Sequence, residues 1–176
     1  GQDSRTAGVQ LTGRHEVAGL TMHFRLEGAR QDGHADSRAD PGRDYRHLRA
    51  GGERRGWSLA LGQEVLGGDG AGSFSTPLAT LHKFNGWADL FLATPAAGLR
   101  DSYLQLGWAT GRWRLTGVYH RFAADQGGAR FGNEADFSAT YRWRERSRFV
   151  LKLADYAADG FGTDTRKLSL QWDLAL

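Results

Sequence analysis

Arginine and lysine side chains recur at alternate positions of several segments, with apolar side chains as their immediate neighbours. Lys167 is followed by Leu168, and Arg142 lies between Tyr141 and Trp143. A row of guanidinium and ammonium groups on one surface attracts anions, especially where low-dielectric walls focus the field. We therefore predict that these cations line an internal lumen: Arg14, Arg25, Arg114, Arg142, Arg148, Lys152 and Lys167.

Further polar side chains are expected on the same surface, and carboxylates are fewer among them than cations. They are Gln10, Thr12, His23, Glu27, His47, Arg49, Ser58, Glu64, Tyr103, Gln105, His120, Asp136, Gln171 and Asp173. The alternative is that these charges pair across strands and merely fill a narrow lumen. The alternation is ambiguous in segments 43–53 and 113–124, which leaves the facing of His47, Arg49 and Arg114 open.

A catalytic arrangement is not predicted. His120, Asp136 and Ser138 are residue types found in hydrolases, but their spacing defines no nucleophile, base and orienting group. We expect a protein that is not an enzyme and that has neither a cofactor nor a metal site.

The elements that position these residues are strands with one apolar and one polar face. In the last segment, Leu168, Leu170, Trp172, Leu174 and Leu176 alternate with Lys167, Ser169, Gln171, Asp173 and Ala175. Side chains of a strand point alternately to opposite faces. The alternating runs reach roughly ten residues, the length of a tilted strand that crosses a bilayer. The pattern predicts an all-β, antiparallel transmembrane β-barrel in the bacterial outer membrane.

Composition agrees with this interpretation. The 176 residues include six Trp and five Tyr, as expected for aromatic girdles at membrane interfaces. No run approaches the roughly 18 apolar residues of a membrane helix. A formal net charge of +3 is too small to indicate nucleic-acid binding, and cysteine is absent.

Nine strands are predicted in one transmembrane domain spanning 1–176, joined by short turns on one side and long connections on the other. Their ranges are 5–17, 20–31, 43–53, 56–67, 99–109, 113–124, 133–144, 147–157 and 165–176. Bacterial barrels have short periplasmic turns and longer extracellular loops, and usually an even number of strands. An odd count, with a first strand that starts on the extracellular side, indicates that part of the barrel is missing.

The connection 68–98 is the longest and is predicted to be an ordered extracellular loop. Pro77 follows Thr76, and Leu78, Leu81 and Phe84 have helical spacing, so a short helix is expected near 77–84. Loops of this length are usually functional when they are ordered. We predict that the loop either constricts the lumen through His82, Lys83 and Trp87 or packs as a lid at the mouth.

From Asp44 onward the chain resembles the C-terminal half of the alginate-export family of outer-membrane proteins. The most specific match is the segment TPLATLHKFNGWAD at 76–89; EVLGGDG at 64–70, Tyr119-His120 and FGTD at 161–164 add to it. Family members are typically barrels of about eighteen strands. The resemblance implies a porin-like channel that passes anionic polysaccharide, oligosaccharide or small anionic solutes.

The resemblance leaves the N-terminal half of such a barrel unaccounted for. We expect the partners to be outer-membrane lipid, an anionic solute, and either a second copy of the chain or a separate N-terminal half-barrel fragment. No nucleic-acid partner is expected. The alternative is a non-conducting small or engineered barrel whose lumen is filled by its own side chains.

Overall fold

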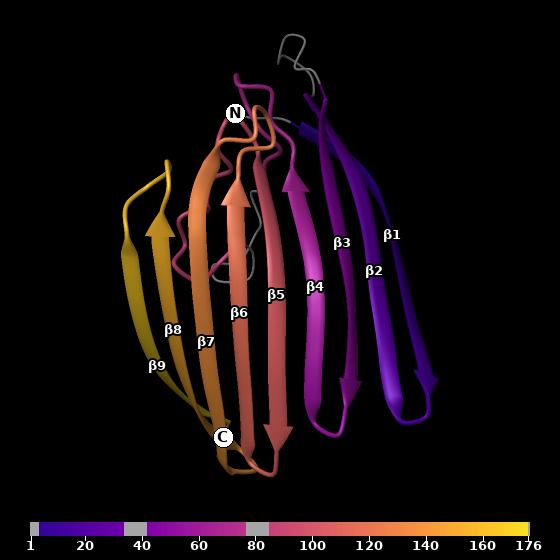
Figure 1. Cartoon of the computed structure of the whole chain (residues 1–176), viewed down its shortest axis with the longest axis vertical. Helices are drawn as coiled ribbons and strands as arrows, with labels where there is room; N and C mark the ends of the chain where they lie inside the picture. Colours follow the sequence, from indigo (N-terminus) through magenta and orange to yellow (C-terminus); the bar gives the residue numbers. More distant parts are fainter. Residues whose placement is uncertain (1–3, 34–41, 77–84, 176) are drawn as a thin grey trace.

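The computed structural model describes residues 4–33, 42–76 and 85–175, which form a single antiparallel sheet in which each strand pairs with the next along the chain (Figure 1). The strands are β1 (Ser4–Val17), β2 (Leu20–Gly33), β3 (Arg43–Arg54), β4 (Trp57–Leu66), β5 (Leu99–Thr110), β6 (Trp113–Ala123), β7 (Arg130–Arg144), β8 (Ser147–Ala158) and β9 (Thr165–Leu174). Each predicted strand corresponds to one of these nine, and the all-β antiparallel meander is confirmed.

Most boundaries lie within one residue of the prediction, and three differ by two or three residues. β2 extends to Gly33 instead of 31. β7 begins at Arg130 instead of 133, because a register shift between Phe122 and Ala123 lets Ala123 of β6 pair with Arg130. β9 ends at Leu174 instead of 176. The predicted helix near 77–84 lies outside the described residues, as does Leu176.

Tight turns join the strands at one end of the sheet, which we call the turn end. Ala18 and Gly19 link β1 to β2 with φ values of 50° and 72°, and Arg55 and Gly56 link β3 to β4 with 50° and 83°. Two consecutive left-handed residues match the twist of antiparallel strands. The longer connections lie at the opposite end, the loop end (Figure 1).

The register decides which side chains share a face. We call the face that carries Tyr103, His120 and Glu134, which are opposite one another on β5, β6 and β7, the inner face. The other face, which carries Leu104, Tyr119 and Leu170, is the outer face. On β9, Leu168 and Leu170 are 69% and 76% exposed, and they lie opposite the apolar Leu153 and Leu151. The predicted alternation is therefore present in the structure.

The sheet is open. β1 and β9 lie at its two sides and do not pair with each other in the described residues (Figure 1). The chain therefore does not close into a ring by itself, as the odd strand count predicted.

The buried apolar side chains gather at the loop end, where the connection between β4 and β5 packs against the inner face. They are Leu66, Phe74, Ala88, Phe91, Leu99, Phe122, Ala124, Phe131, Ala154 and Tyr156. Elsewhere the sheet has no second layer among the described residues, so most of its apolar side chains stay exposed on the outer face. No helix within the described residues is long and apolar enough to cross a membrane.

Candidate functional site

All seven cations predicted to share a surface lie on the inner face. The register supports this strand by strand: Arg14 lies opposite His23, Arg25 opposite Arg49, Arg114 opposite Thr140, Arg142 opposite Arg148, Lys152 opposite Ser138, and Lys167 opposite Ala154. The same register places His47 and Arg49 on this face, opposite Glu64 and Gly62. The tertiary structure thus decides the three facings that the alternation left open.

The structure brings only some of these cations together. Arg114, Arg142 and Arg148 line one recess of about 750 Å³ at the turn end. The Nε of Arg148 donates to Asp173 at 2.6 Å. Arg114 and Arg142 are exposed and form no ion pair with any described residue. An anion that enters this recess therefore meets two guanidinium groups with free donors.

The other predicted cations lie elsewhere on the inner face. Arg25 contacts Gln10 at 2.9 Å and Glu27 at 3.1 Å near the β1 side, and Arg14 is exposed. Lys152 and Lys167, on β8 and β9, contact the β4–β5 connection. These residues are spread across the sheet and do not form one cluster.

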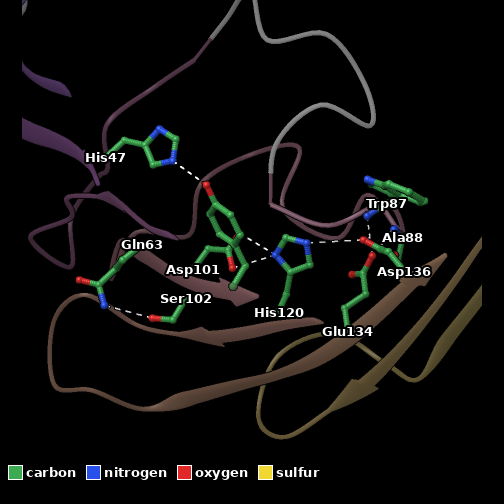
Figure 2. A network of polar contacts seen from close by, with 10 residues as sticks. His47, Gln63, Trp87, Ala88, Asp101, Ser102, His120, Glu134 and Asp136 are labelled. Carbon is green, nitrogen blue, oxygen red and sulfur yellow. Dashed lines mark hydrogen bonds and ion pairs between the residues drawn. The ribbon is translucent and has the colours of Figure 1, made fainter. Parts of the chain in front are cut away.

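Near the loop end, the inner face carries a row of buried polar side chains. Tyr45 donates its hydroxyl to Glu64 at 2.6 Å. His47 is on the same strand as Tyr45, and its Nε2 lies 2.9 Å from the hydroxyl of Tyr103 on β5, on the far side of β4 (Figure 2). This row extends the polar surface from β3 across to β5.

His120 continues the row onto β6. Its Nδ1 lies 2.9 Å from both carboxylate oxygens of Asp101, and its Nε2 lies 3.6 Å from Asp136 Oδ2 (Figure 2). His120, Asp101 and Asp136 are all buried. No serine or threonine hydroxyl of the described chain is hydrogen-bonded to His120. The histidine therefore has the surroundings of a structural bridge between two carboxylates.

Glu134, on β7, holds the β4–β5 connection against the inner face. Its Oε1 accepts hydrogen bonds from the backbone N–H of Trp87 at 2.5 Å and of Ala88 at 2.7 Å (Figure 2). Asn85 and Gly86 precede these amides with φ values of 58° and 87°. The two successive N–H groups of this turn converge on one oxygen, and turns with convergent N–H groups bind anionic oxygens. We call this contact between Glu134 and residues 85–88 the loop latch.

Two further contacts fix the same segment. Asp89 forms an ion pair with Lys167 on β9. The ammonium of Lys152, on β8, lies 5.6 Å from the centroid of the Trp87 ring. This distance falls within the range of cation–π attraction. Trp87, predicted to belong to a constriction, thus contacts the inner face, whereas His82 and Lys83 lie outside the described residues.

Phe91 anchors the segment through aromatic packing. Its ring centroid lies 4.6 Å from that of Phe122 and 5.2 Å from that of Phe161, and its side chain is buried. The hydroxyl of the buried Tyr156 reaches the carbonyls of Phe131 and Phe161 at 2.7 and 2.8 Å. The β4–β5 connection, the start of β7 and the β8–β9 connection therefore share one apolar cluster.

Four inward carboxylates were missed by the sequence prediction: Glu16, Glu53, Asp101 and Glu134. Asp101 and Glu134 are both 1% exposed. Asp101 has the parity of Tyr103, and Glu134 has that of Asp136, so the alternation already contained the information. Including them reduces the surplus of cations on the inner face. The charges are segregated, because Glu64, Asp101, Glu134 and Asp136 are buried near the loop end, whereas Arg14, Arg114 and Arg142 are exposed.

No group of three or more histidine and acidic side chains in the described residues is arranged to hold a metal ion. The inner face presents hydrogen-bonding groups near the loop end and exposed guanidinium groups near the turn end.

No protein-family model matches this chain, and no curated protein sequence matches it. The resemblance to alginate-export proteins thus stays a prediction.

Proposed function

We propose that this chain forms part of the wall of a bacterial outer-membrane β-barrel that passes anionic solutes, as its resemblance to alginate-export proteins implies. In this proposal the outer face contacts lipid, the inner face lines the lumen, and the connection at 68–98 lies on the extracellular side. The turn end then lies at the periplasm.

The apolar outer face is the observation that carries the proposal. Exposed leucines follow one another along and across the strands: Leu59 and Leu61 on β4, Leu104 and Leu106 on β5, Leu153 on β8, and Leu168 and Leu170 on β9. A soluble monomer rarely exposes a contiguous apolar patch of more than a few hundred Å². Hydrocarbon is a solvent in which such a face is stable, provided that the backbone hydrogen bonds are satisfied within the sheet.

Aromatic side chains border this apolar face at the turn end. The ring centroids of Trp57 and Trp108 are 5.9 Å apart, and those of Trp113 and Tyr141 are 4.7 Å apart. Trp172 continues the border on β9. Five of the six tryptophans in the sequence lie in this border, namely Trp57, Trp108, Trp113, Trp143 and Trp172. Aromatic girdles of this kind lie at the headgroup level of membranes.

The exposed inward arginines support passage of anions. Arg114 and Arg142 line the recess at the turn end and lack ion-pair partners among the described residues. In the proposed orientation they lie at the periplasmic mouth. A guanidinium group is always charged and offers several donors, so it lowers the barrier for carboxylate-bearing solutes.

The two open strand edges require neighbours. An unpaired N–H or C=O in hydrocarbon costs several kcal/mol, so β1 and β9 must pair with further strands in a membrane. A second copy or an N-terminal half-barrel fragment would supply them and bring the ring to about eighteen strands. A detergent-corrected mass measurement tests this requirement, and a folded particle with one 19.4 kDa copy and no other polypeptide would contradict it.

Ion selectivity of the assembled barrel in planar bilayers tests the transport proposal. Under a KCl gradient we expect a reversal potential that indicates preference for chloride, and we expect Arg114→Gln/Arg142→Gln to move it toward zero. Arg46→Gln/Arg121→Gln removes the same charge from the outer face and should leave the reversal potential unchanged. Channels without anion preference, or equal effects of both double variants, would contradict the proposal.

A non-conducting barrel is the second candidate. Residues 87–91 lie against the inner face and are fixed there by Glu134, Lys167 and the Phe91 cluster. If this segment fills the lumen, the assembled protein inserts into bilayers without measurable single-channel conductance. Conductance that appears only when the loop latch is broken would favour this candidate over an open channel.

A further inference from the structure

The outer face has different borders at its two ends. On β6, the outward side chains run from Trp113 at the turn end through Leu115, Gly117 and Tyr119 to Arg121. On β9, they run from Leu174 and Trp172 near the turn end through Leu170 and Leu168 to Arg166. Along both strands the series has an aromatic ring near the turn end, crosses the apolar band, and ends at a guanidinium group.

The same ending occurs on most strands. The outward residue that ends the apolar band at the loop end is an arginine on five of the nine strands, and on β5 an arginine follows one outward position beyond Ser102. These arginines are Arg5, Arg30, Arg46, Arg100, Arg121 and Arg166. We call this set the arginine border. The remaining strands end the band with Gln63 on β4, Asn133 on β7 and Asp155 on β8.

Charge on the border is only partly compensated by nearby carboxylates. Arg30 pairs with Asp32 and Asp44 at 3.3 Å. Arg166 pairs with Asp155 at 3.2 Å, yet its side chain is 86% exposed. Exposed pairs of this kind contribute about 0–1 kcal/mol, so their arginines remain available to a stronger ligand.

Three arginines of the border have no such partner among the described residues: Arg5, Arg46 and Arg121. All three are exposed. Arg121 lies directly opposite Ser102, so Arg100, two residues before Ser102, is its diagonal neighbour on the same face. Arg100 itself reaches Asp125 only at 3.5 Å. Two guanidinium groups at diagonal positions repel each other, and an anion between them would relieve that repulsion.

We propose that the arginine border binds the phosphate groups of lipid headgroups in the membrane leaflet at the loop end. This inference rests on the proposed transmembrane function, because only a membrane places headgroups along the edge of the apolar band. Arginine binds phosphate through two parallel hydrogen bonds, which lysine and the aromatic border cannot offer. The contrast between a tryptophan border and an arginine border matches a bilayer whose loop-end leaflet carries more phosphate than the other.

Lipid titration of the full chain in a neutral detergent tests the inference, with bound lipids counted by native mass spectrometry. The probes are phosphatidic acid, which exposes a phosphate monoester, and phosphatidylcholine with the same acyl chains. We expect phosphatidic acid to bind more tightly, and we expect Arg46→Gln/Arg121→Gln to weaken it about fivefold for each arginine removed. The matched variant Arg54→Gln/Arg146→Gln loses the same charge at the turn end and should bind phosphatidic acid like the unmodified protein.

Several outcomes would overturn the inference. Equal affinity for the two lipids, or an equal loss in both double variants, would show that the arginine border does not select phosphate. Displacement of phosphatidic acid by an equal concentration of inorganic phosphate would assign the arginines to a free anion.

Insertion into phosphatidylcholine vesicles, measured by protease protection of the strands, separates this inference from the proposed function. Failure of the unmodified chain and its partner strands to insert would contradict the transmembrane proposal itself. Insertion without preference for phosphatidic acid would contradict only the lipid inference. Insertion of Arg46→Gln/Arg121→Gln to the normal extent confirms that a loss of lipid binding does not arise from misfolding.

Discussion

Replacement of Glu134 by alanine tests whether the loop latch holds the β4–β5 connection on the inner face. The substitution removes the acceptor of two backbone N–H groups, those of Trp87 and Ala88. A hydrogen bond to a charged group contributes about 1.5–3 kcal/mol. Two such bonds would suggest a loss of about 3–6 kcal/mol for the docked segment.

Two features of the site reduce this expected loss of free energy. The other oxygen, Glu134 Oε2, has no hydrogen-bond partner within the described residues, so alanine also removes a poorly solvated acceptor. The segment keeps the Asp89–Lys167 ion pair and the packing of Phe91. We therefore expect the free energy of local opening to fall by about 2–4 kcal/mol.

Hydrogen–deuterium exchange of the assembled protein measures this change at single residues. A loss of about 2–4 kcal/mol corresponds to exchange of the Trp87 and Ala88 amides that is about 30 to 1000 times faster. Glu27→Ala is the matched control, because it removes an inward carboxylate of β2 that contacts Arg25 and not the loop. Unchanged exchange at both amides in Glu134→Ala would refute the latch. Equally faster exchange throughout β5–β7 would show that Glu134 stabilises the sheet and not the loop.

Three further predictions follow from particular contacts. Gly86→Ala should speed the hydrogen exchange of the Trp87 and Ala88 amides, because a Cβ at residue 86 would lie 2.4 Å from Glu134 Oε2. Gly70→Ala, at a similar positive φ with open space around it, should show only the backbone cost of about 1–2 kcal/mol. Leu170→Arg should reduce the free energy of unfolding from lipid vesicles, measured in a urea titration, by about 2–4 kcal/mol. Ser169→Arg should reduce it much less. Equal reductions would contradict the assignment of the two faces. The carboxylate of Asp69 accepts N–H bonds from Gly72 at 2.8 Å and Ala71 at 2.9 Å, which lower its pKa below the ordinary value. The ionised Asp69 carboxylate therefore stabilises the 69–72 turn at pH values above the ordinary aspartate pKa, and this stabilisation is lost as the pH falls through the lower folded-state pKa. A carboxyl carbon resonance of Asp69 that titrates at the same pH in the folded protein and in urea would contradict this.

The strands could be predicted from sequence because their pattern is local. In the last segment, Leu168, Leu170 and Trp172 alternate with polar residues, and a period of two has only one regular backbone conformation. The turn at Ala18-Gly19 was also visible, since it interrupts the alternation where a hairpin must reverse. The next turn was predicted at 53–55, whereas the left-handed residues are Arg55 and Gly56. Strand order followed because consecutive antiparallel strands joined by short turns pair with each other.

The face of the sheet on which a side chain lies was harder to predict where apolar and polar residues did not alternate regularly. In β3, glycine and alanine occupy outward positions, so apolar side chains did not mark the lipid side, and His47 and Arg49 stayed ambiguous. Register settles them, because residues directly opposite each other in neighbouring strands share a face, and His47 lies opposite Glu64. Asp101 and Glu134 follow the parity of Tyr103 and Asp136, but their burial against the β4–β5 connection depends on a loop that the strand pattern does not describe.

The sequence by itself determined the all-β antiparallel meander, the amphipathic faces and the odd strand count, because each depends on side chains that are neighbours along one or two strands. Only the tertiary structure decided that Trp87 and Ala88 meet Glu134, that Asp89 meets Lys167, and that the outward arginines line one end of the apolar band. Glu134 is separated from Trp87 by 47 residues and Lys167 from Asp89 by 78. No local pattern encodes such pairs, since they arise from the curvature and register of the whole sheet and from the path of a loop that crosses its inner face.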